Sequence, residues 1–535
     1  MTSGKQSLAG LPPAVPGTLG ETLWLNAWHF GRKIAVSTEA RTVTHAELYR
    51  RSHRIAAGLA ALGLSRNERF AMLAMNRVEM AEIYAAAEIS GIAIVPLNFR
   101  LSAAELAATL RDCTPSVLFF EDQYTDTVNE LRSVLGPAVP LIRIGADAAA
   151  TPDWAPPFED FVTAAPEFVE WTPFSPDSLA CILYTSGTTG APKGCMHSHR
   201  GFRALSELVT IKLGMTASDR TLVMMPLFHM GGKSVQLGAH WSGGELFVHR
   251  GFDPGDILRT IARERITVTH LAPMMIQNVL EHPEIDSHDL SSLRAIFYSA
   301  APMPEPVLRR GLEKLGPVFI QSYGQTEGSG TILPAGCHRL DGTERDRRHL
   351  TSVGVPARGV DLKIVDPEGN ECPEEVPGEV MLRTACAMTG YWNNPEATRE
   401  TLQDGWLRTG DIGLLDDEGF LFLVDRKKDV IISGGENIYS REVENAIWSH
   451  PEVAEVVVIG VPDPKWGEAV CAIVVREQGS TLTGEGVIEH CRTMIAGYKR
   501  PRVVEFADAL PKLASGKVDK KALRQSRADR AEVSG

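Results

Sequence analysis

Helix-like and strand-like patterns alternate through the first part of this 535-residue chain. Thr44 and Glu47 have the spacing of a capping box at the start of a helical pattern over residues 44–63. Short apolar runs at residues 70–75 and 92–97 are typical of buried strands. Such alternation is characteristic of βαβ units, so it predicts an α/β fold with a largely parallel sheet.

The same alternation continues beyond the second apolar run. A helical pattern over residues 78–90 is stopped by Gly91, and Ser102 with Glu105 forms a second capping-box pattern. A strand-like run resumes at residues 117–120. The repeated order of strand and helix extends the predicted parallel sheet.

Later stretches of the chain differ in character. Residues 144–176 are rich in Ala, Pro and acidic groups without periodicity, which predicts a surface connection. The α/β pattern returns from residue 178 to about 340, and short β-like runs over residues 352–424 indicate a smaller β subdomain. Residues 429–535 suffice for a small α+β domain. The predicted architecture is a large N-terminal domain of α/β subdomains with a β subdomain, followed by a small α+β domain.

Composition excludes several classes of protein. The formal net charge of −13 argues against nucleic acid as the main partner, because phosphate binding needs a basic face. The 8 cysteines contain no C-x-x-C pair, which favours reduced thiols over a zinc site or a disulfide framework. Neither a secretory signal nor an apolar run of about 18 residues is present, so we expect a cytoplasmic protein without a membrane span.

The segment YTSGTTGAPKG, residues 184–194, follows the apolar run at residues 179–183. A strand followed by a loop rich in glycine and hydroxyl groups is suited to phosphate, because backbone N–H groups and hydroxyls can turn inward. The spacing does not match a Walker A loop. The alternative is an ordinary surface loop, which so many glycines and hydroxyls, together with a lysine, disfavour.

This loop resembles the signature of the adenylate-forming superfamily, which includes acyl-CoA synthetases, aryl-CoA ligases, nonribosomal adenylation domains and luciferases. The other motifs of that superfamily follow in order. They are PLFHMGG (226–232), YSAAPMP (298–304), QSYGQTEG (321–328), WLRTGDIG (406–413), DRKKD (425–429), ISGGENIYSREVE (432–444) and LPKLASGKVDKKALR (510–524). The resemblance implies an N-terminal AMP-binding domain over residues 1–424, a hinge at 425–428, and a C-terminal lid domain over 429–535 that carries a catalytic lysine.

The resemblance also assigns roles to individual residues. The catalytic groups are Lys517, Thr188, Glu327 and His229, and Glu327 also holds Mg²⁺. Contacts to ATP and AMP fall on Thr185, Ser186, Gly187, Thr189, Lys193, Ala301, Tyr323, Thr326, Asp411 and Arg426. The hinge residue is Lys428, the CoA tunnel passes Gly434 and Gly435, and the acyl pocket contains Phe228, Gly231, Gly232, Ser299 and Gly324. Ser322 departs from the glycine that many members carry before the tyrosine.

The implied reaction uses ATP to convert a carboxylic acid to an acyl-adenylate and then, with CoA, to an acyl-CoA, releasing AMP and pyrophosphate. Apolar Phe228, Met230 and Val235, with space left by Gly231 and Gly232, favour a medium- or long-chain fatty acid or an aryl or cyclic acid. Alternatives are transfer to a carrier protein, activation of an amino acid, a luciferase-like oxygenase, and a non-catalytic nucleotide-binding protein.

Other basic residues allow two interpretations each. Lys233 could pair with a second carboxylate of a substrate, but a lysine on a helix surface is the commoner case. Lys499, Arg500 and Arg502 are candidates for the 3′-phosphate of CoA by charge, and a solvated surface cluster is the alternative. A homodimer is a possible assembly.

Overall fold

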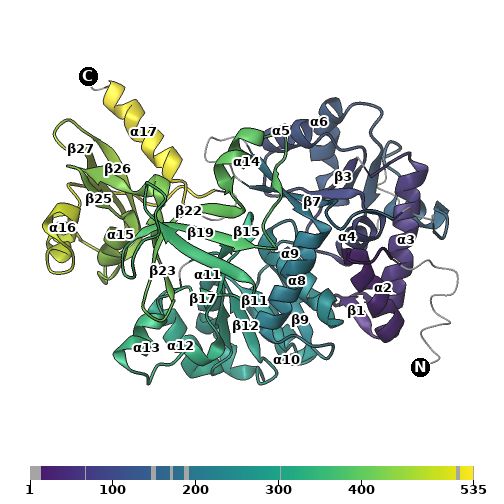
Figure 1. Cartoon of the computed structure of the whole chain (residues 1–535), viewed down its shortest axis with the longest axis horizontal. Coiled ribbons are helices and arrows are strands. Elements are labelled where there is room, and N and C mark those ends of the chain that lie inside the picture. The colour runs from purple at the N-terminus through teal and green to yellow at the C-terminus, as the bar shows by residue number, and fades with distance from the viewer. Residues whose placement is uncertain are drawn as a thin grey trace. The chain divides into compact units, whose positions relative to one another are not determined.

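The computed structural model describes residues 14–533 except 67, 146–151, 169–172, 186–191, 302 and 514–517. The chain, which Figure 1 colours by residue number, divides into two compact units. Unit 1 comprises the residues up to 362 together with 382–408, and unit 2 comprises residues 363–381 and 409–535. The predicted hinge at 425–428 falls within unit 2 and stays a prediction.

The first sheet of unit 1 has the order β20-β8-β7-β4-β3-β5-β6. Its strands are β3 (Arg69–Leu73), β4 (Ala93–Pro96), β5 (Leu118–Glu121), β6 (Leu141–Ile144), β7 (Leu179–Thr185), β8 (Lys193–Ser198) and β20 (Gly390–Tyr391). Strands β3 to β7 pair in parallel, whereas β8 pairs antiparallel with β7 and with β20. The predicted α/β class is confirmed.

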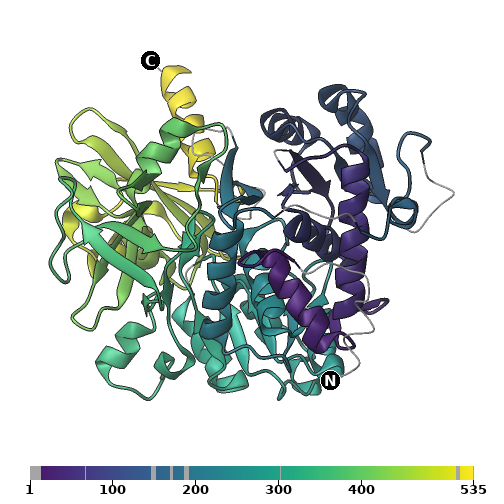
Figure 2. The same ribbon diagram turned by 45° about the vertical axis from the view of Figure 1, so that its right-hand side comes forward.

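The helices around these strands include the three that the sequence predicts, at 44–63, at 78–90 and after Ser102. The helices are α2 (Leu19–Phe30), α3 (His45–Ala61), α4 (Val78–Ser90), α5 (Ala103–Cys113), α6 (Thr125–Leu135) and α7 (Phe158–Ala164). Both predicted capping boxes form, at Thr44 with Glu47 and at Ser102 with Glu105. Gly91 ends α4 in a left-handed conformation at φ 72°. Helices α2 and α3, in purple, pack side by side (Figure 2).

One expectation for this region is wrong in part. The stretch from 144 to 176 is more than a surface connection, because it contains α7, whose Phe158 and Val162 are buried. Phe158 lies edge-on to Phe119 of β5, with ring centroids 6.1 Å apart. A helix of 7 residues is too short for its apolar spacing to stand out in the sequence.

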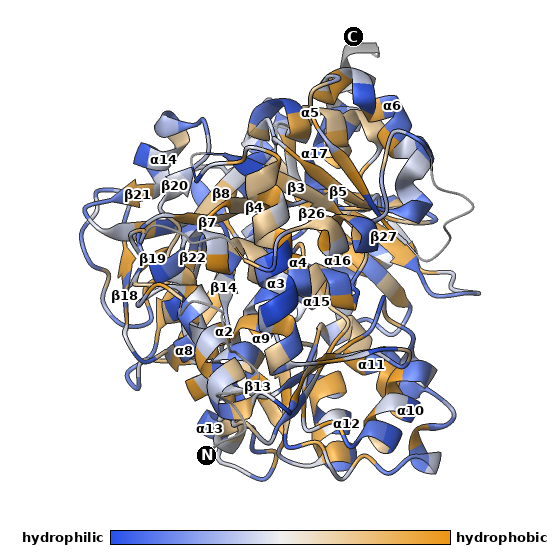
Figure 3. Ribbon diagram, turned by 90° about the vertical axis from the view of Figure 1, so that its right-hand side faces the viewer, coloured by the Kyte–Doolittle hydropathy of each residue, from blue (hydrophilic) through white to orange (hydrophobic). Residues whose placement is uncertain are grey.

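The second sheet of unit 1 has the order β13-β12-β11-β9-β10-β1-β2 and is parallel apart from the β1–β2 pair. Its strands are β1 (Ile34–Ser37), β2 (Thr42–Thr44), β9 (Arg220–Val223), β10 (Glu245–Val248), β11 (Val268–Leu271), β12 (Ala295–Tyr298) and β13 (Phe319–Gln321). Its helices are α8 (His199–Leu213), α9 (Met230–Ser242), α10 (Pro254–Glu264), α11 (Pro273–Glu281) and α12 (Glu305–Leu315). Helices such as α10 and α12 carry hydrophobic and hydrophilic faces, whereas β3 and β5 are hydrophobic over most of their length (Figure 3).

The remaining elements of the middle of the chain are short, and the predicted β-rich stretch is confirmed. They are β14 (Gly324–Gln325), β15 (Gly328–Ser329), β16 (Thr331–Ile332), α13 (Glu344–His349), β17 (Val355–Pro356), β18 (Val360–Val365), β19 (Gly378–Thr384), α14 (Pro395–Thr401), β21 (Leu402–Gln403), β22 (Trp406–Leu415) and β23 (Leu421–Arg426). Turns of 3₁₀ helix lie at η1 (Asp122–Tyr124), η3 (Ile285–Ser287), η4 (Ala335–Cys337), η5 (Lys427–Asp429) and η6 (Gly497–Lys499).

The C-terminal part of unit 2 is a small α+β structure, as predicted. Its sheet has the order β25-β24-β27-β26, with β28 parallel to β27. The elements are β24 (Ile431–Ser433), β25 (Glu436–Ile438), α15 (Ser440–Trp448), β26 (Val453–Asp463), β27 (Gly467–Arg476), α16 (Gly484–Arg492), β28 (Val503–Phe506) and α17 (Lys520–Val533). None of the helices in the described part of the chain is long and apolar enough to cross a membrane.

Candidate active site

The glycine-rich segment is the connection of a β-hairpin. Strand β7 ends at Thr185 and β8 begins at Lys193, and these two residues are paired across the ladder. The Thr185 hydroxyl donates to the Lys193 carbonyl over 3.4 Å. A Walker A loop leads directly into a helix, so the return into β8 agrees with its exclusion. The predicted phosphate contacts Ser186, Gly187, Thr188 and Thr189 lie outside the described residues.

A second, tighter hairpin carries the QSYGQTEG motif. Glu327 lies between the two-residue strands β14 and β15, which pair Gly324 with Ser329. A Cβ on Gly324 would lie 2.9 Å from the Ser329 Cα, so this position requires glycine. Tyr323, just before β14, and Thr326, in the turn beside Glu327, are both buried. Glu327 is therefore held on a short, closely packed turn.

Tyr391 links the two hairpins and was not predicted from the sequence. Its hydroxyl donates to Glu327 Oε1 over 2.7 Å, and its backbone pairs with Cys195 of β8. The Lys193 ammonium nitrogen lies 5.1 Å from the centre of the Tyr391 ring. Burial and the Glu327 carboxylate raise the pKa of Tyr391 far above its usual range, so the phenol keeps its proton and donates. The structure thus brings Lys193, Glu327 and Tyr391 together.

Lys212 of α8 contacts the second hairpin, and this role was also not predicted from the sequence. Its ammonium donates to the hydroxyls of Ser322, over 2.8 Å, and Ser329, over 3.1 Å. Burial lowers the pKa of Lys212 to about 8. The Ser322 hydroxyl donates a hydrogen bond to the Thr331 carbonyl over 2.7 Å. The serine that departs from the family pattern is therefore a partner of a buried lysine.

The PLFHMGG motif forms the start of helix α9. His229 is the N-cap residue, and its Nδ1 accepts the backbone N–H of Gly231 over 3.1 Å. A Cβ on Gly232 would lie 2.4 Å from the Pro226 carbonyl oxygen, so this glycine allows close packing and leaves no open space. Phe228 is buried edge-on against Phe99 with ring centroids 5.2 Å apart. Their place in an acyl pocket stays a prediction.

The YSAAPMP motif follows strand β12 directly. Ser299 is half-buried, and its hydroxyl lies 2.8 Å from Nε2 of His270 on β11. Ala300 has a φ of 74°, which is costly for a residue with a Cβ. Ala301 is exposed. Strained turns of this kind occur preferentially at functional sites.

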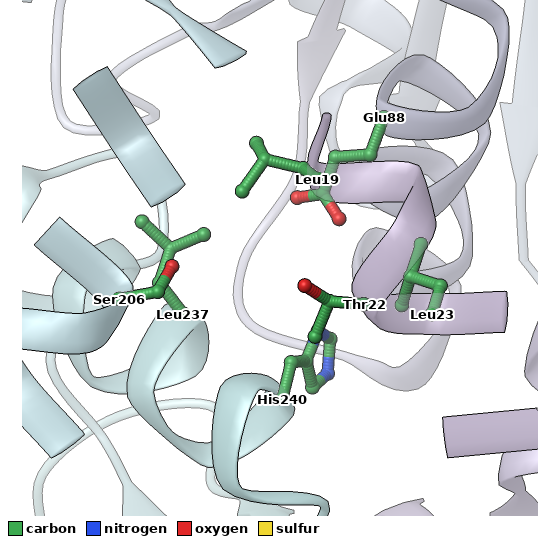
Figure 4. A pocket seen from close by; sticks show the side chains of 7 residues that line it. All are labelled: Leu19, Thr22, Leu23, Glu88, Ser206, Leu237 and His240. Atoms are coloured by element: carbon green, nitrogen blue, oxygen red, sulfur yellow. The ribbon is translucent and has the colours of Figure 1, made fainter. Parts of the chain in front are cut away.

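The expectation of a surface position for Lys233 is wrong. Its side chain is 1% exposed, and Nζ lies 2.9 Å from Glu88 Oε1 and 3.8 Å from the centre of the Tyr84 ring. Glu88 lines a small internal pocket with Thr22, with the buried His240 (Figure 4) and with the apolar side chains of α2 and α9. A lysine that already neutralises a buried carboxylate does not serve a second carboxylate on a substrate.

In unit 2, two predicted nucleotide contacts are neighbours. Asp411 of β22 is paired with Arg426 of β23, and Arg426 Nε lies 2.5 Å from Asp411 Oδ1. Asp411 is buried and Arg426 is largely exposed. The predicted hinge residue Lys428 is exposed in turn η5. Binding of ribose by Asp411 and Arg426 stays a prediction.

The predicted CoA passage lies between β24 and β25. Gly434 has a φ of 63° and Gly435 a φ of 84°, both in the left-handed region. A Cβ on Gly434 would meet the Trp466 ring at 2.8 Å, whereas beside Gly435 there is open space. Lys517 lies outside the described residues.

Two of the three basic residues proposed for the CoA phosphate, Lys499 and Arg502, already have partners, whereas the buried Nε of Arg500 has no hydrogen-bond partner among the described residues. Lys499 Nζ donates to Glu442 over 2.7 Å, so its charge is compensated. The Arg502 guanidinium lies over the Trp466 ring, 4.5 Å from its centre. Neither contact points to a dedicated phosphate site.

Comparison with known families gives two matches. The model of the family described as AMP-binding enzyme matches residues 23–392, and that of the AMP-binding enzyme C-terminal domain matches residues 442–517. The first range contains the motif at 184–194, and the second ends at residue 517, within the motif at 510–524.

Individual relatives cover nearly the whole chain. A feruloyl-CoA synthase from Amycolatopsis sp. is 38% identical over 92% of this chain and 95% of the relative. A fatty acid–acyl-carrier-protein ligase from Streptomyces coeruleorubidus is 35% identical over 95% of this chain and 96% of the relative. The o-succinylbenzoate CoA synthetase of Bacillus subtilis, solved with an acyl-adenylate intermediate, superimposes with a TM-score of 0.82 at 32% identity, over 94% of this chain and 97% of that structure.

Proposed function

This chain belongs to the family of AMP-binding enzymes, and we infer that it activates a carboxylic acid with ATP and transfers the acyl group to CoA. It is an AMP-forming acid–thiol ligase. The observation that carries this conclusion is that Tyr391 contacts both Lys193 and Glu327. It thereby connects the β7–β8 hairpin, proposed to bind phosphate, with the β14–β15 hairpin that carries the carboxylate. Feruloyl-CoA synthase and the fatty-acid ligase among its relatives support an aryl or fatty acid as substrate.

In the first half-reaction the carboxylate of the substrate attacks the α-phosphate of ATP, and pyrophosphate leaves. Negative charge gathers on phosphoryl oxygens, so catalysis depends on groups placed to stabilise it. Thr188, Thr189 and Lys193 are the proposed donors around the phosphates, with Lys517 from the C-terminal domain. Tyr323 stacks on adenine, and Thr326 donates to the α-phosphate.

The residues present fit a magnesium ion. Among the described residues no cluster of three or more His, Cys, Asp and Glu side chains is placed to hold a metal. Mg²⁺ in ATP-dependent enzymes needs only one or two protein carboxylates, since phosphate and water supply the other ligands. Glu327 is the proposed ligand, oriented by the hydrogen bond from Tyr391. When bound, Mg²⁺ would neutralise charge on the phosphates.

In the second half-reaction the thiolate of CoA attacks the acyl carbonyl, and AMP leaves. His229 is proposed to bind the carboxyl group of the substrate. Gly434 and Gly435 are proposed to flank the pantetheine arm, and their positive φ values keep side chains away from this stretch of backbone. Lys428 is the proposed pivot between the two half-reactions.

The test is release of pyrophosphate from ATP and Mg²⁺ over a panel of aryl and fatty acids, with and without CoA. We expect turnover with one class of acid that rises with CoA, and a loss of roughly 10²–10³-fold in Lys517→Ala. Turnover that rises only with an acyl carrier protein would instead favour the carrier-protein alternative. Silence with every acid would contradict the assignment.

A further inference from the structure

Two histidines share the peptide groups of one residue, Gly231. The Gly231 N–H donates to Nδ1 of His229 over 3.1 Å. The Gly231 carbonyl oxygen lies 3.1 Å from Nδ1 of His270, which comes from strand β11. The N–H can only donate and the carbonyl oxygen can only accept. These two groups therefore determine which nitrogen of each neutral ring carries the proton.

His270 is neutral and protonated on Nδ1. The side chain is fully buried, and burial lowers its pKa to about 4. A carbonyl oxygen only accepts, so the proton of the neutral ring must lie on Nδ1, facing Gly231. The opposite tautomer would set two lone pairs against each other. The ring also packs against Phe297, with ring centroids 4.5 Å apart and the ring planes tilted by 38°.

The tautomer of His270 determines the polarity of Ser299. Because Nε2 of His270 carries a lone pair, the hydroxyl 2.8 Å away must donate its single proton to it. The Ser299 oxygen therefore keeps only acceptor capacity for any other partner. Ser299 is half-buried on the turn after β12, so a ligand can reach it.

His229 has the opposite polarity. Its Nδ1 accepts an N–H, so in the neutral ring the proton lies on Nε2. His229 is exposed, and Nε2–H is the donor of its ring. The surroundings of Gly231 thus combine one donor residue and one acceptor residue. The Met225 methyl group, 3.4 Å from where a Gly231 Cβ would lie, adds an apolar contact.

We propose that Ser299 is a specificity-determining residue that accepts a hydrogen bond from a hydroxyl group on the acid substrate, and that His270 is the positioning residue that holds it in this state. The proposal rests on the function inferred above and narrows its substrate to a hydroxylated acid, of which phenolic acids are the form tested below. A second carboxylate is disfavoured, because Ser299 offers it no proton and Lys233 is paired with Glu88.

The experiment compares kcat/KM for cinnamic acid with its hydroxy and methoxy derivatives at the 2, 3 and 4 ring positions. A methoxy group occupies the same place but cannot donate. For the wild type we expect the hydroxy acid to exceed the methoxy acid at least about tenfold at one ring position, because a buried acceptor left unpaired is costly. In Ser299→Ala the ratio of kcat/KM for the hydroxy acid to kcat/KM for the methoxy acid should fall to about 1.

His270→Phe tests the positioning role, with His270→Gln as the conservative variant. The phenylalanine variant frees the Ser299 proton, so its preference for hydroxy over methoxy acids should fall; the glutamine variant, whose amide oxygen can accept that proton, should keep more of it. Equal rates for hydroxy and methoxy acids in the wild type, with CoA-dependent turnover intact, would overturn this proposal and leave the proposed function standing. A preference that survives Ser299→Ala would overturn it too. Failure of every acid to release pyrophosphate would overturn both.

Discussion

The N-cap residue of helix α9 and the polar side chains within that helix differ in exposure. At the N-terminal end, His229 is exposed and its Nδ1 is hydrogen-bonded to the first turn of the helix. Further along, Lys233 and His240 are buried, and both ring nitrogens of His240 lack a hydrogen-bond partner among the described residues. Exposed groups on a fixed backbone suit chemistry, whereas buried polar groups affect chiefly stability.

This contrast separates two kinds of variant. Changes at the exposed N-cap residue His229 should lower activity and leave the free energy of unfolding nearly unchanged. Changes in the buried part should alter the free energy of unfolding and spare the activity of the folded enzyme. Four experiments test this division, and they begin with the largest expected effect.

Breaking the buried ion pair should have the largest effect. Lys233→Met leaves the Glu88 carboxylate buried without its cation, so we expect a loss of about 3–5 kcal/mol in the free energy of unfolding. Urea denaturation measures it. The double variant Lys233→Met with Glu88→Gln should recover most of the loss, because neither charge then remains. An equal loss in both variants would show that packing matters more than the charge.

Removing the exposed histidine should act on catalysis. His229→Ala should lower kcat/KM by roughly 10²–10³-fold, because a donor to the carboxyl group is lost. Its melting temperature should stay within about 2 °C of wild type, as for most exposed substitutions. His29→Ala, an exposed histidine of α2, is the matched control and should change neither quantity. A large fall in melting temperature for His229→Ala would contradict the expected difference between the exposed and the buried positions.

The buried His240 should lower the free energy of unfolding at acid pH. Burial lowers the pKa of His240 to about 3, so the folded protein keeps it neutral while the unfolded chain protonates it below about 6.5. The unfolded state then binds more protons, and stability is lost as the pH falls. Between pH 7 and 5 this group should cost the wild type about 2 kcal/mol, a cost that His240→Leu should not show. If the free energy of unfolding of the wild type and of His240→Leu changed equally with pH, His240 would not be buried in its neutral form.

Lys212 of α8 offers a second comparison, because it is buried but donates two hydrogen bonds, to Ser322 and Ser329. Its folded pKa of about 8 lies below the value of about 10.4 for an unfolded chain. Between these values the unfolded state binds more protons, so stability rises with pH. From pH 7.5 to 9 the wild type should gain about 1 kcal/mol relative to Lys212→Met in urea denaturation. A constant difference would indicate that the lysine titrates normally.

Local patterns predicted the elements well. The capping boxes, the stop at Gly91 and most strands depend on residues a few positions apart, so the sequence contains the necessary information. The short helix α7 was missed because its 7 residues offer too few apolar positions to reveal a period.

The candidate site was predictable only in its residue types. Motif order indicated His229, Glu327 and Lys193, but nothing near Tyr391 in the sequence signals its bond to Glu327, 64 positions away. Lys233 was expected on a surface, because its neighbours do not reveal Glu88, which is 145 positions away. Such partners cannot be predicted from one sequence, since the residues next to a lysine in the chain do not show whether its side chain lies in water or beside a buried carboxylate.

The sequence by itself determined the family, the α/β class and the identity of the groups available for chemistry, because these depend on short motifs. Only the tertiary structure decided how those groups are protonated and paired. The tautomer of His270 depends on a carbonyl 39 positions away in the chain, and the polarity of Ser299 depends on that tautomer. A hydrogen bond needs two atoms within about 3 Å, and folding alone brings distant residues that close.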